Sequence, residues 1–152
     1  MEPIGQRLRL AYYDASDGPR VMIFGPLEAD FSKIHEFFLT LAKNPASSYE
    51  LHLQPFIVAF NRTAITTSCI GGGLSTKPNY QQGIRRIADG GRPNFEWQRT
   101  AEGWDYLADL VLPLVTLTTA AHQYLTRYPG EDAIVVLSKG EYNDDVLDTV
   151  EP

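Results

Sequence analysis

The sequence is poor in the residue types from which catalytic and metal centres are usually built. It has one cysteine, Cys69, and three histidines, His35, His52 and His122, among 152 residues. A single cysteine excludes an intrachain disulfide and a cysteine-based metal cluster. No histidine is followed at two or four residues by a second good metal ligand, and Glu36 adjoins His35 rather than facing it. We therefore expect no metal site and no cofactor.

Motifs for nucleophilic catalysis and phosphate binding are also missing. The chain contains no Gly-x-Ser-x-Gly elbow, and no histidine lies near Cys69 in the sequence. The stretch Gly71 to Lys77, GGGLSTK, differs from a phosphate-binding loop because its lysine follows the Ser-Thr pair and no second glycine precedes that lysine. We interpret residues 71–81 as a loop and predict no catalytic residue and no enzymatic activity.

Long hydrophobic runs are absent too. No stretch approaches the roughly 18 apolar residues of a membrane span, and the first residues, MEPIGQRLRLAYY, lack the apolar core of about 7 to 15 residues that a signal peptide needs. These features predict a cytoplasmic protein that does not bind a membrane. A chain of this length with 43% hydrophobic and 21% charged residues is expected to fold as one domain, residues 1–152, with an acidic segment at 141–152.

The negative charge of the chain is concentrated at its end. Residues 131–152 contain seven acidic residues against one basic residue, Lys139, whereas acidic and basic residues balance over 1–130. The whole net charge of -6 therefore belongs to the last part of the chain. This distribution argues against nucleic acid as the partner of that end, and it is typical either of a solvated tail or of a surface that attracts a basic protein.

The most basic part of the chain lies just before the second helix that we predict. It could bind an anion or RNA, but only one aromatic residue with a plausible stacking face, Trp97, is interspersed with its arginines. We predict no nucleic-acid partner. The arginines are Arg85, Arg86, Arg92 and Arg99.

Hydrophobic periodicity predicts strands in the first half of the chain and a helix between them. Alternation over 7–13 and a short apolar run at 20–25, separated by an Asp/Ser/Gly/Pro cluster, indicate a hairpin. Apolar residues at spacings of three and four predict a helix over 27–43, with Asp30 as N-cap. Residues 51–60 form the next extended segment, interrupted at Pro55, and 63–70 is expected to return antiparallel to it.

The second half is also expected to contain strands and a helix. Residues 83–87 and 95–97 can be read as strand, turn and strand, and a short helix over 79–88 competes with this reading. Thr100 is expected to cap the longest apolar helix, residues 100–120, which Pro113 should kink or split. A terminal hairpin follows at 123–125 and 133–138. The fold class predicted is α+β, with a mainly antiparallel sheet and the helices 27–43 and 100–120 packed on one face.

Several residues of the second half carry a resemblance to a functional class. With Trp97, Trp104, the run His122-Gln123-Tyr124-Leu125 and the terminus Ser138-Lys139-Gly140-Glu141-Tyr142, the chain resembles small bacterial proteins that include immunity proteins of contact-dependent or type VI secreted toxins. The resemblance covers about the last third of the chain. It implies a cytoplasmic antidote that binds one toxin domain tightly and catalyses no reaction.

The leading hypothesis is therefore a protein-binding module whose partner, a toxin domain for example, is basic. Aromatic anchors and charge would then determine affinity and association rate. The rival is an enzyme or ligand-binding protein whose pocket is lined by Arg99, His122, Tyr124 and the Gly71–Gly73 loop. An obligate homodimer is a third possibility, and His122 could alternatively bind the terminal carbonyls of the second helix. The predicted partner-binding residues are Trp97, Glu102, Asp105, Asp109, Glu141, Asp144, Asp145 and Asp148.

Overall fold

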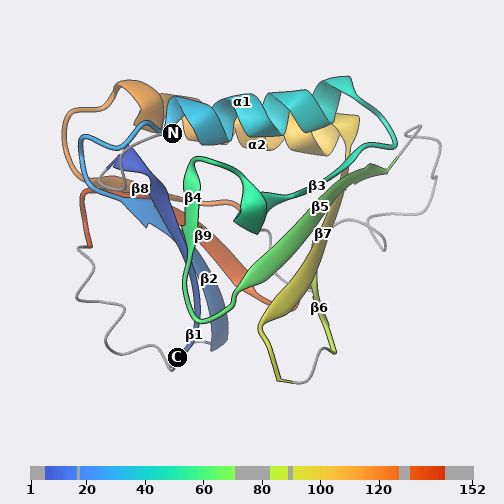
Figure 1. Ribbon diagram of the computed structural model, residues 1–152. Coiled ribbons are helices and arrows are strands. Elements are labelled where there is room, and N and C mark those ends of the chain that lie inside the picture. Colours follow the sequence, from blue (N-terminus) through green and yellow to red (C-terminus); the bar gives the residue numbers. More distant parts are fainter. Residues whose placement is uncertain (1–5, 17, 71–82, 89–90, 127–130, 143–152) are drawn as a thin grey trace.

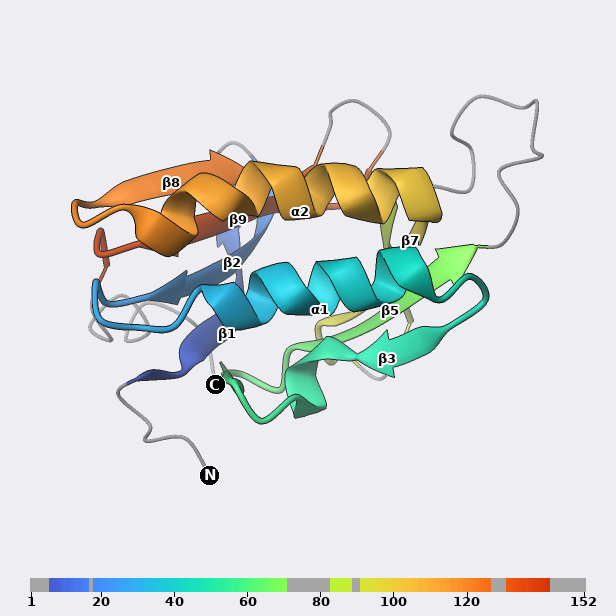
Figure 2. The same ribbon diagram turned by 90° about the horizontal axis from the view of Figure 1, so that it is seen from above.

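The computed structural model describes residues 6–16, 18–70, 83–88, 91–126 and 131–142 (Figure 1). Two α-helices lie side by side and antiparallel on one side of two β-sheets (Figures 1 and 2). This arrangement confirms the α+β class with two principal helices. The elements are β1 Leu8–Ala15, β2 Gly18–Gly25, α1 Ser32–Lys43, β3 Ser48–Glu50, a short 3-10 turn Leu51–Leu53, β4 Ile57–Ala59, β5 Ala64–Ile70, β6 Gly83–Ile87, β7 Asn94–Thr100, α2 Ala101–Thr116, β8 Ala121–Tyr124 and β9 Ile134–Lys139.

The strands divide into two sheets rather than one. Sheet A has the order β4-β1-β2-β9-β8, and sheet B has the order β3-β5-β7-β6. The pairs β1–β2, β8–β9, β3–β5 and β6–β7 are antiparallel, whereas β1–β4, β2–β9 and β5–β7 are parallel. The predicted hairpin partners are therefore correct at both ends of the chain, and the parallel pairings join strands that lie far apart in the sequence.

The order of the strands reveals an internal repeat that the residue pattern does not show. The first half runs β1-β2-α1-β3-β5 and the second runs β6-β7-α2-β8-β9, and in each half the two strands before and the two after the helix pair antiparallel. Each sheet combines the hairpin of one half with the second strand pair of the other, joined by a parallel pairing. Sheet A has β4 as an addition. Neither half therefore completes a sheet alone.

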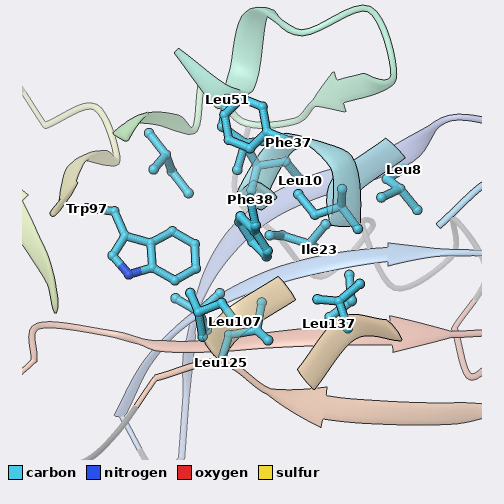
Figure 3. Close-up of a cluster of buried hydrophobic side chains, with 14 of the residues drawn as sticks. Leu8, Leu10, Ile23, Phe37, Phe38, Leu51, Trp97, Leu107, Leu125 and Leu137 are labelled. Atoms are coloured by element: carbon cyan, nitrogen blue, oxygen red, sulfur yellow. The ribbon is translucent and has the colours of Figure 1, made fainter. Parts of the chain in front are cut away.

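A cluster of aromatic rings fills the space between the helices and sheet B. The ring of Phe38 stacks on Trp104 with a centroid distance of 5.5 Å, and Trp97 meets Trp104 at 5.2 Å and Phe38 at 5.9 Å. Figure 3 shows Trp97 and Phe38 within the same cluster of buried side chains as Leu107. Truncation of a buried aromatic ring typically costs about 3 to 5 kcal/mol, so this cluster contributes strongly to the association of the two helices.

The helix ends agree with the sequence in part. Thr100 caps α2 as predicted, because its side-chain oxygen accepts a hydrogen bond from the Gly103 N–H at 3.1 Å. Helix α1 begins at Ser32, later than residue 27, and the predicted N-cap Asp30 is wrong because Phe31 occupies the N-cap position; Asp30 instead accepts the Ser32 N–H at 3.0 Å in the turn before the helix. The expected split at Pro113 is wrong, since α2 continues to Thr116. Proline lacks one backbone donor, and so near its C-terminal end α2 loses a single hydrogen bond.

The predicted strand over 51–60 is also corrected. The chain changes sheets within this segment, because β3 belongs to sheet B, Leu51–Leu53 forms a turn and β4 belongs to sheet A. Strand β5 therefore pairs antiparallel with β3 and not with 51–60. Residues 83–87 form β6, so the strand interpretation is right and the competing helix is wrong. Among the described residues, no helix is long and apolar enough to cross a membrane.

Candidate functional site

Three of the predicted partner-binding residues lie together on the exposed side of α2. Glu102, Asp105 and Asp109 are all exposed, and they are spaced by three and four residues along the helix. With about 3.6 residues per turn, such spacing places the three carboxylates on one strip of the helix surface. Within the described part of the chain these three carboxylates form no ion pair.

Trp97 does not belong to this surface, and its assignment as a partner-binding residue is wrong. Its side chain is 0% exposed and packs between Phe38 and Trp104. The physical reason is the alternation in β7, where Phe95 and Trp97 both face the helices. That alternation is visible in the sequence and could have placed Trp97 in the core.

Exposed apolar side chains that the sequence reasoning missed occupy the same side of α2. Tyr106 is 42% exposed and Leu112 is 47% exposed. Tyr106 follows Glu102 by four residues, a spacing that already indicates a shared helix face. We call the set Glu102, Asp105, Tyr106, Asp109 and Leu112 the α2 face. It combines three negative charges with two apolar groups on a helix whose opposite side is anchored in the core.

Glu141 occupies a different and more constrained position. Its Oε1 accepts a hydrogen bond from the Ser138 hydroxyl at 2.5 Å, and its Oε2 lies 2.9 Å from Nδ1 of His122. Burial raises the pKa of the Glu141 carboxyl, but the hydrogen bonds from Ser138 and His122 and the charge of the imidazolium outweigh it, so the pKa lies below its ordinary value. The carboxylate is therefore ionised at neutral pH.

The alternative role of His122 at the end of α2 is filled by another residue. Lys139, which is 4% exposed, donates from Nζ to the carbonyl oxygens of Leu114 and Leu117, both at 2.6 Å. Residues alternate in β9, so Lys139 faces the helices together with Leu137. His122 pairs with Ser138 across β8 and β9 and faces away from the helices. The lysine, not the histidine, binds the terminal carbonyls of α2.

The predicted pocket of Arg99, His122 and Tyr124 is not formed. Arg99 lies two residues after Trp97 in β7, so both side chains are on the helix-facing side of sheet B, just before the start of α2. His122 and Tyr124 follow α2 and lie on the side of sheet A that faces away from the helices. A helix of 16 residues is about 24 Å long. The arginine and the histidine are thus at opposite ends of α2, because β7 and β8 meet opposite ends of that helix.

Two predicted surfaces therefore point to opposite sides of the molecule. The α2 face lies on the exposed side of α2, opposite the buried residues of that helix, and Glu141 contacts Ser138 and His122, whose side chains face away from the helices on sheet A. Three further acidic residues and the glycine run lie outside the described residues. These are Asp144, Asp145, Asp148 and Gly71–Gly73.

The local chemistry of the Ser138, Glu141 and His122 group differs from that of a catalytic triad. The serine donates to the carboxylate and not to the imidazole, so no base is placed to activate its hydroxyl.

Cys69 is buried, and burial raises the pKa of its thiol, although a backbone hydrogen bond from Ala46 opposes this effect. A buried thiol with a raised pKa is a poor nucleophile.

Part of the acidic end of the chain has a structural role. Glu131 accepts the Ile84 N–H, and Asp132 accepts the Arg86 N–H, both at 2.9 Å. The Asp132 N–H also donates to the Ile84 carbonyl at 3.0 Å. These contacts occupy backbone groups along the edge strand β6. The two carboxylates therefore stabilise sheet B, in contrast with a purely solvated tail.

Comparisons with known proteins leave the resemblance to immunity proteins as a prediction. No protein-family model matches the chain, and neither the curated proteins nor the solved structures contain a significant match.

Proposed function

We propose that this protein is a non-enzymatic protein-binding module and that it recognises a basic partner through the α2 face. The observation that carries the proposal is the presence of three exposed carboxylates and two exposed apolar side chains on one side of a single helix. The resemblance of the sequence to immunity proteins suggests the identity of the partner. We propose a bacterial toxin domain that the protein neutralises in the cytoplasm.

The composition of the α2 face suits this role. Tyrosine is enriched among the residues that dominate binding energy in protein interfaces, since its ring covers a large area at a low cost in side-chain entropy. Tyr106 and Leu112 would supply the apolar contact. Glu102, Asp105 and Asp109 would attract a basic surface, raise the association rate and exclude acidic proteins.

The helix that carries the α2 face is held rigidly at both ends. Thr100 caps its start, and Lys139 binds the carbonyl oxygens of Leu114 and Leu117 at its end. Between them, Trp104 packs on Phe38 and donates to the Ser68 carbonyl at 2.9 Å. A surface that is ordered before binding loses less conformational entropy when the complex forms.

Co-expression with the product of the neighbouring gene tests the proposal. The protein should rescue growth if that product is a toxin, and calorimetry should measure direct binding. The Tyr106→Ala variant should bind about 30-fold more weakly, as expected for an anchor worth roughly 2 kcal/mol. The Asp105→Lys/Asp109→Lys variant should bind about 10-fold more weakly, mainly through slower association.

A matched double variant separates the α2 face from general charge effects. Glu28 and Glu50 are exposed and lie outside α2, so Glu28→Lys/Glu50→Lys changes the net charge equally and should leave affinity nearly unchanged. If both double variants weaken binding to the same extent, the α2 face is not the contact surface. Absence of rescue and of binding would overturn the immunity function.

Light scattering of the unbound protein and of the Tyr106→Ala variant tests the homodimer hypothesis on the same surface.

A further inference from the structure

The outer side of sheet A carries a second exposed group of side chains around β8. Tyr124 is 46% exposed and Tyr142 is 41% exposed, and beside them lie His122, two residues before Tyr124 in β8, and Glu141, which directly precedes Tyr142 and contacts His122. We call Tyr124, His122, Glu141 and Tyr142 the β8 patch. We propose that the β8 patch binds an arginine side chain of a basic protein, independently of the α2 face.

The carboxylate of the β8 patch is fixed and ionised, yet it retains hydrogen-bonding capacity. Ser138 and His122 occupy one acceptor position on each oxygen of Glu141. Each carboxylate oxygen has two lone pairs, so both oxygens can accept a further N–H donor. The Glu141 side chain is 28% exposed, so such donors can reach it from solution.

The two carboxylate oxygens of Glu141 are a pair of neighbouring acceptors, and His122 and Ser138 hold them in place. Nδ1 of His122 lies 2.9 Å from Oε2, and the His122 side chain is itself 47% exposed. A guanidinium has five N–H donors in a planar fork, which suits neighbouring acceptors better than the compact ammonium of lysine. This arrangement favours arginine as the ligand.

The two exposed tyrosine rings of the patch each contact another ring. Tyr124 meets His122 edge to face at 5.6 Å, and Tyr142 meets Phe24 edge to face at 6.4 Å. Phe24 aligns with Ser138 and Ser138 with His122 across neighbouring strands, so the residues that the two tyrosine rings contact lie next to Ser138, the residue that also donates to Glu141. Exposed aromatic rings attract guanidinium groups through cation–π interactions.

A tyrosine next to a carboxylate already binds an arginine elsewhere in the molecule. The Arg86 guanidinium lies 4.7 Å from the centroid of the Tyr12 ring and donates to the Tyr12 hydroxyl at 2.8 Å. That hydroxyl in turn donates to Asp14 at 2.8 Å. Tyr12 thus links a guanidinium of β6 to a carboxylate of its own strand β1. The β8 patch presents tyrosine and carboxylate in the same neighbourhood toward solution.

Titration of the full chain with N-acetylarginine-N′-methylamide tests the proposal by two-dimensional ¹H–¹⁵N NMR. Saturable shifts should appear at His122, Tyr124, Glu141 and Tyr142. The citrulline analogue, which is uncharged and nearly the same shape, should produce no saturable shift. The Glu141→Gln variant should bind the arginine probe about 2- to 5-fold more weakly, in the range of an exposed charge contact, and Tyr124→Leu should also weaken binding.

Control variants distinguish this inference from the function proposed for α2. Asp109→Asn alters the α2 face and should leave the shifts around β8 unchanged. Circular dichroism confirms folding of each variant, and Tyr124→Leu remains informative if Glu141→Gln fails to fold, because Tyr124 is exposed. The proposal is overturned if shifts around β8 are absent, if citrulline binds equally, or if neither variant weakens binding. Each of these results leaves the test of the α2 face unaffected.

Discussion

Lys139 illustrates how one residue can link the end of a helix to a distant strand. Its ammonium donates to two carbonyls of α2 at 2.6 Å and lies 5.3 Å from the centroid of the Phe31 ring. The last turn of α2 contains no basic residue of its own. A strand from the end of the chain therefore supplies the positive charge that a helix C-terminus favours.

Replacement of Lys139 by methionine should destabilise the fold. Methionine preserves most of the apolar stem but leaves two carbonyls without their donor, and we expect a loss of about 2 kcal/mol in the free energy of unfolding. Urea denaturation at neutral pH measures the change. Lys43→Met is the matched control, since Lys43 is exposed at the end of α1 and should change stability by less than about 0.5 kcal/mol. Equal losses in the two variants would show that the carbonyl contacts of Lys139 contribute little.

Glu141 should make stability depend on pH in the acid range. Its pKa is lower in the folded protein than its ordinary value of 4.5, so its contribution is fully present above that value and is lost as pH falls through the folded pKa. The free energy of unfolding of the natural protein should exceed that of Glu141→Gln at about pH 6, and the difference should shrink toward about pH 3. Ser138→Ala should reduce this difference, because it removes one hydrogen bond that lowers the pKa. A difference that does not vary with pH would contradict the assignment.

At the scale of elements, local patterns predicted the strands and helices better than their partners. The alternation in β1, the β-branched residues of β5 and the Thr100 cap of α2 are properties of short segments, and each matches the structure closely. The pairing of β2 with β9 joins residues more than a hundred positions apart, for example Val21 with Val135. Period-2 alternation assigns a residue to a face but does not select the neighbouring strand, so the division into two sheets was not predictable.

The candidate surfaces show the same limit. The acidic strip of α2 followed from helical spacing alone, and spacing would also have added Tyr106. By contrast, the contact of His122 with Glu141 depends on the turn after β9, where Gly140 has a φ of 72° and its N–H donates to the Gly25 carbonyl. Glycine adopts this backbone conformation at little cost. Without the position of that turn, the sequence does not indicate which side of the molecule Glu141 occupies.

At the scale of the whole molecule, the exchange of strand pairs between the two halves should make unfolding cooperative. Sheet A contains β8 and β9 from the second half, and sheet B contains β3 and β5 from the first. The helices of the two halves also pack on each other through Phe38 and Trp104. Loss of either half therefore removes strands from both sheets, and neither sheet should persist without the other.

Native-state hydrogen exchange can measure this cooperativity. The most protected amides of β2 and β9 in sheet A, and of β5 and β7 in sheet B, should open with the same free energy. Tryptophan fluorescence, which reports on Trp97 and Trp104, should follow the same denaturant transition as far-ultraviolet circular dichroism. Two separate transitions, or a sheet that exchanges at distinctly lower free energy, would show that the halves are not coupled.

The pairing of β2 with β9 also has a consequence for the order of events during synthesis. Gly25 at the end of β2 meets Lys139, which is made 114 residues later. At translation rates of about 5 to 20 residues per second, β2 waits roughly 6 to 23 seconds for this neighbour. During that interval the apolar strand exposes an unpaired edge, and chaperones have time to bind it. The nascent N-terminal half, rather than the finished protein, is therefore the form most exposed to aggregation.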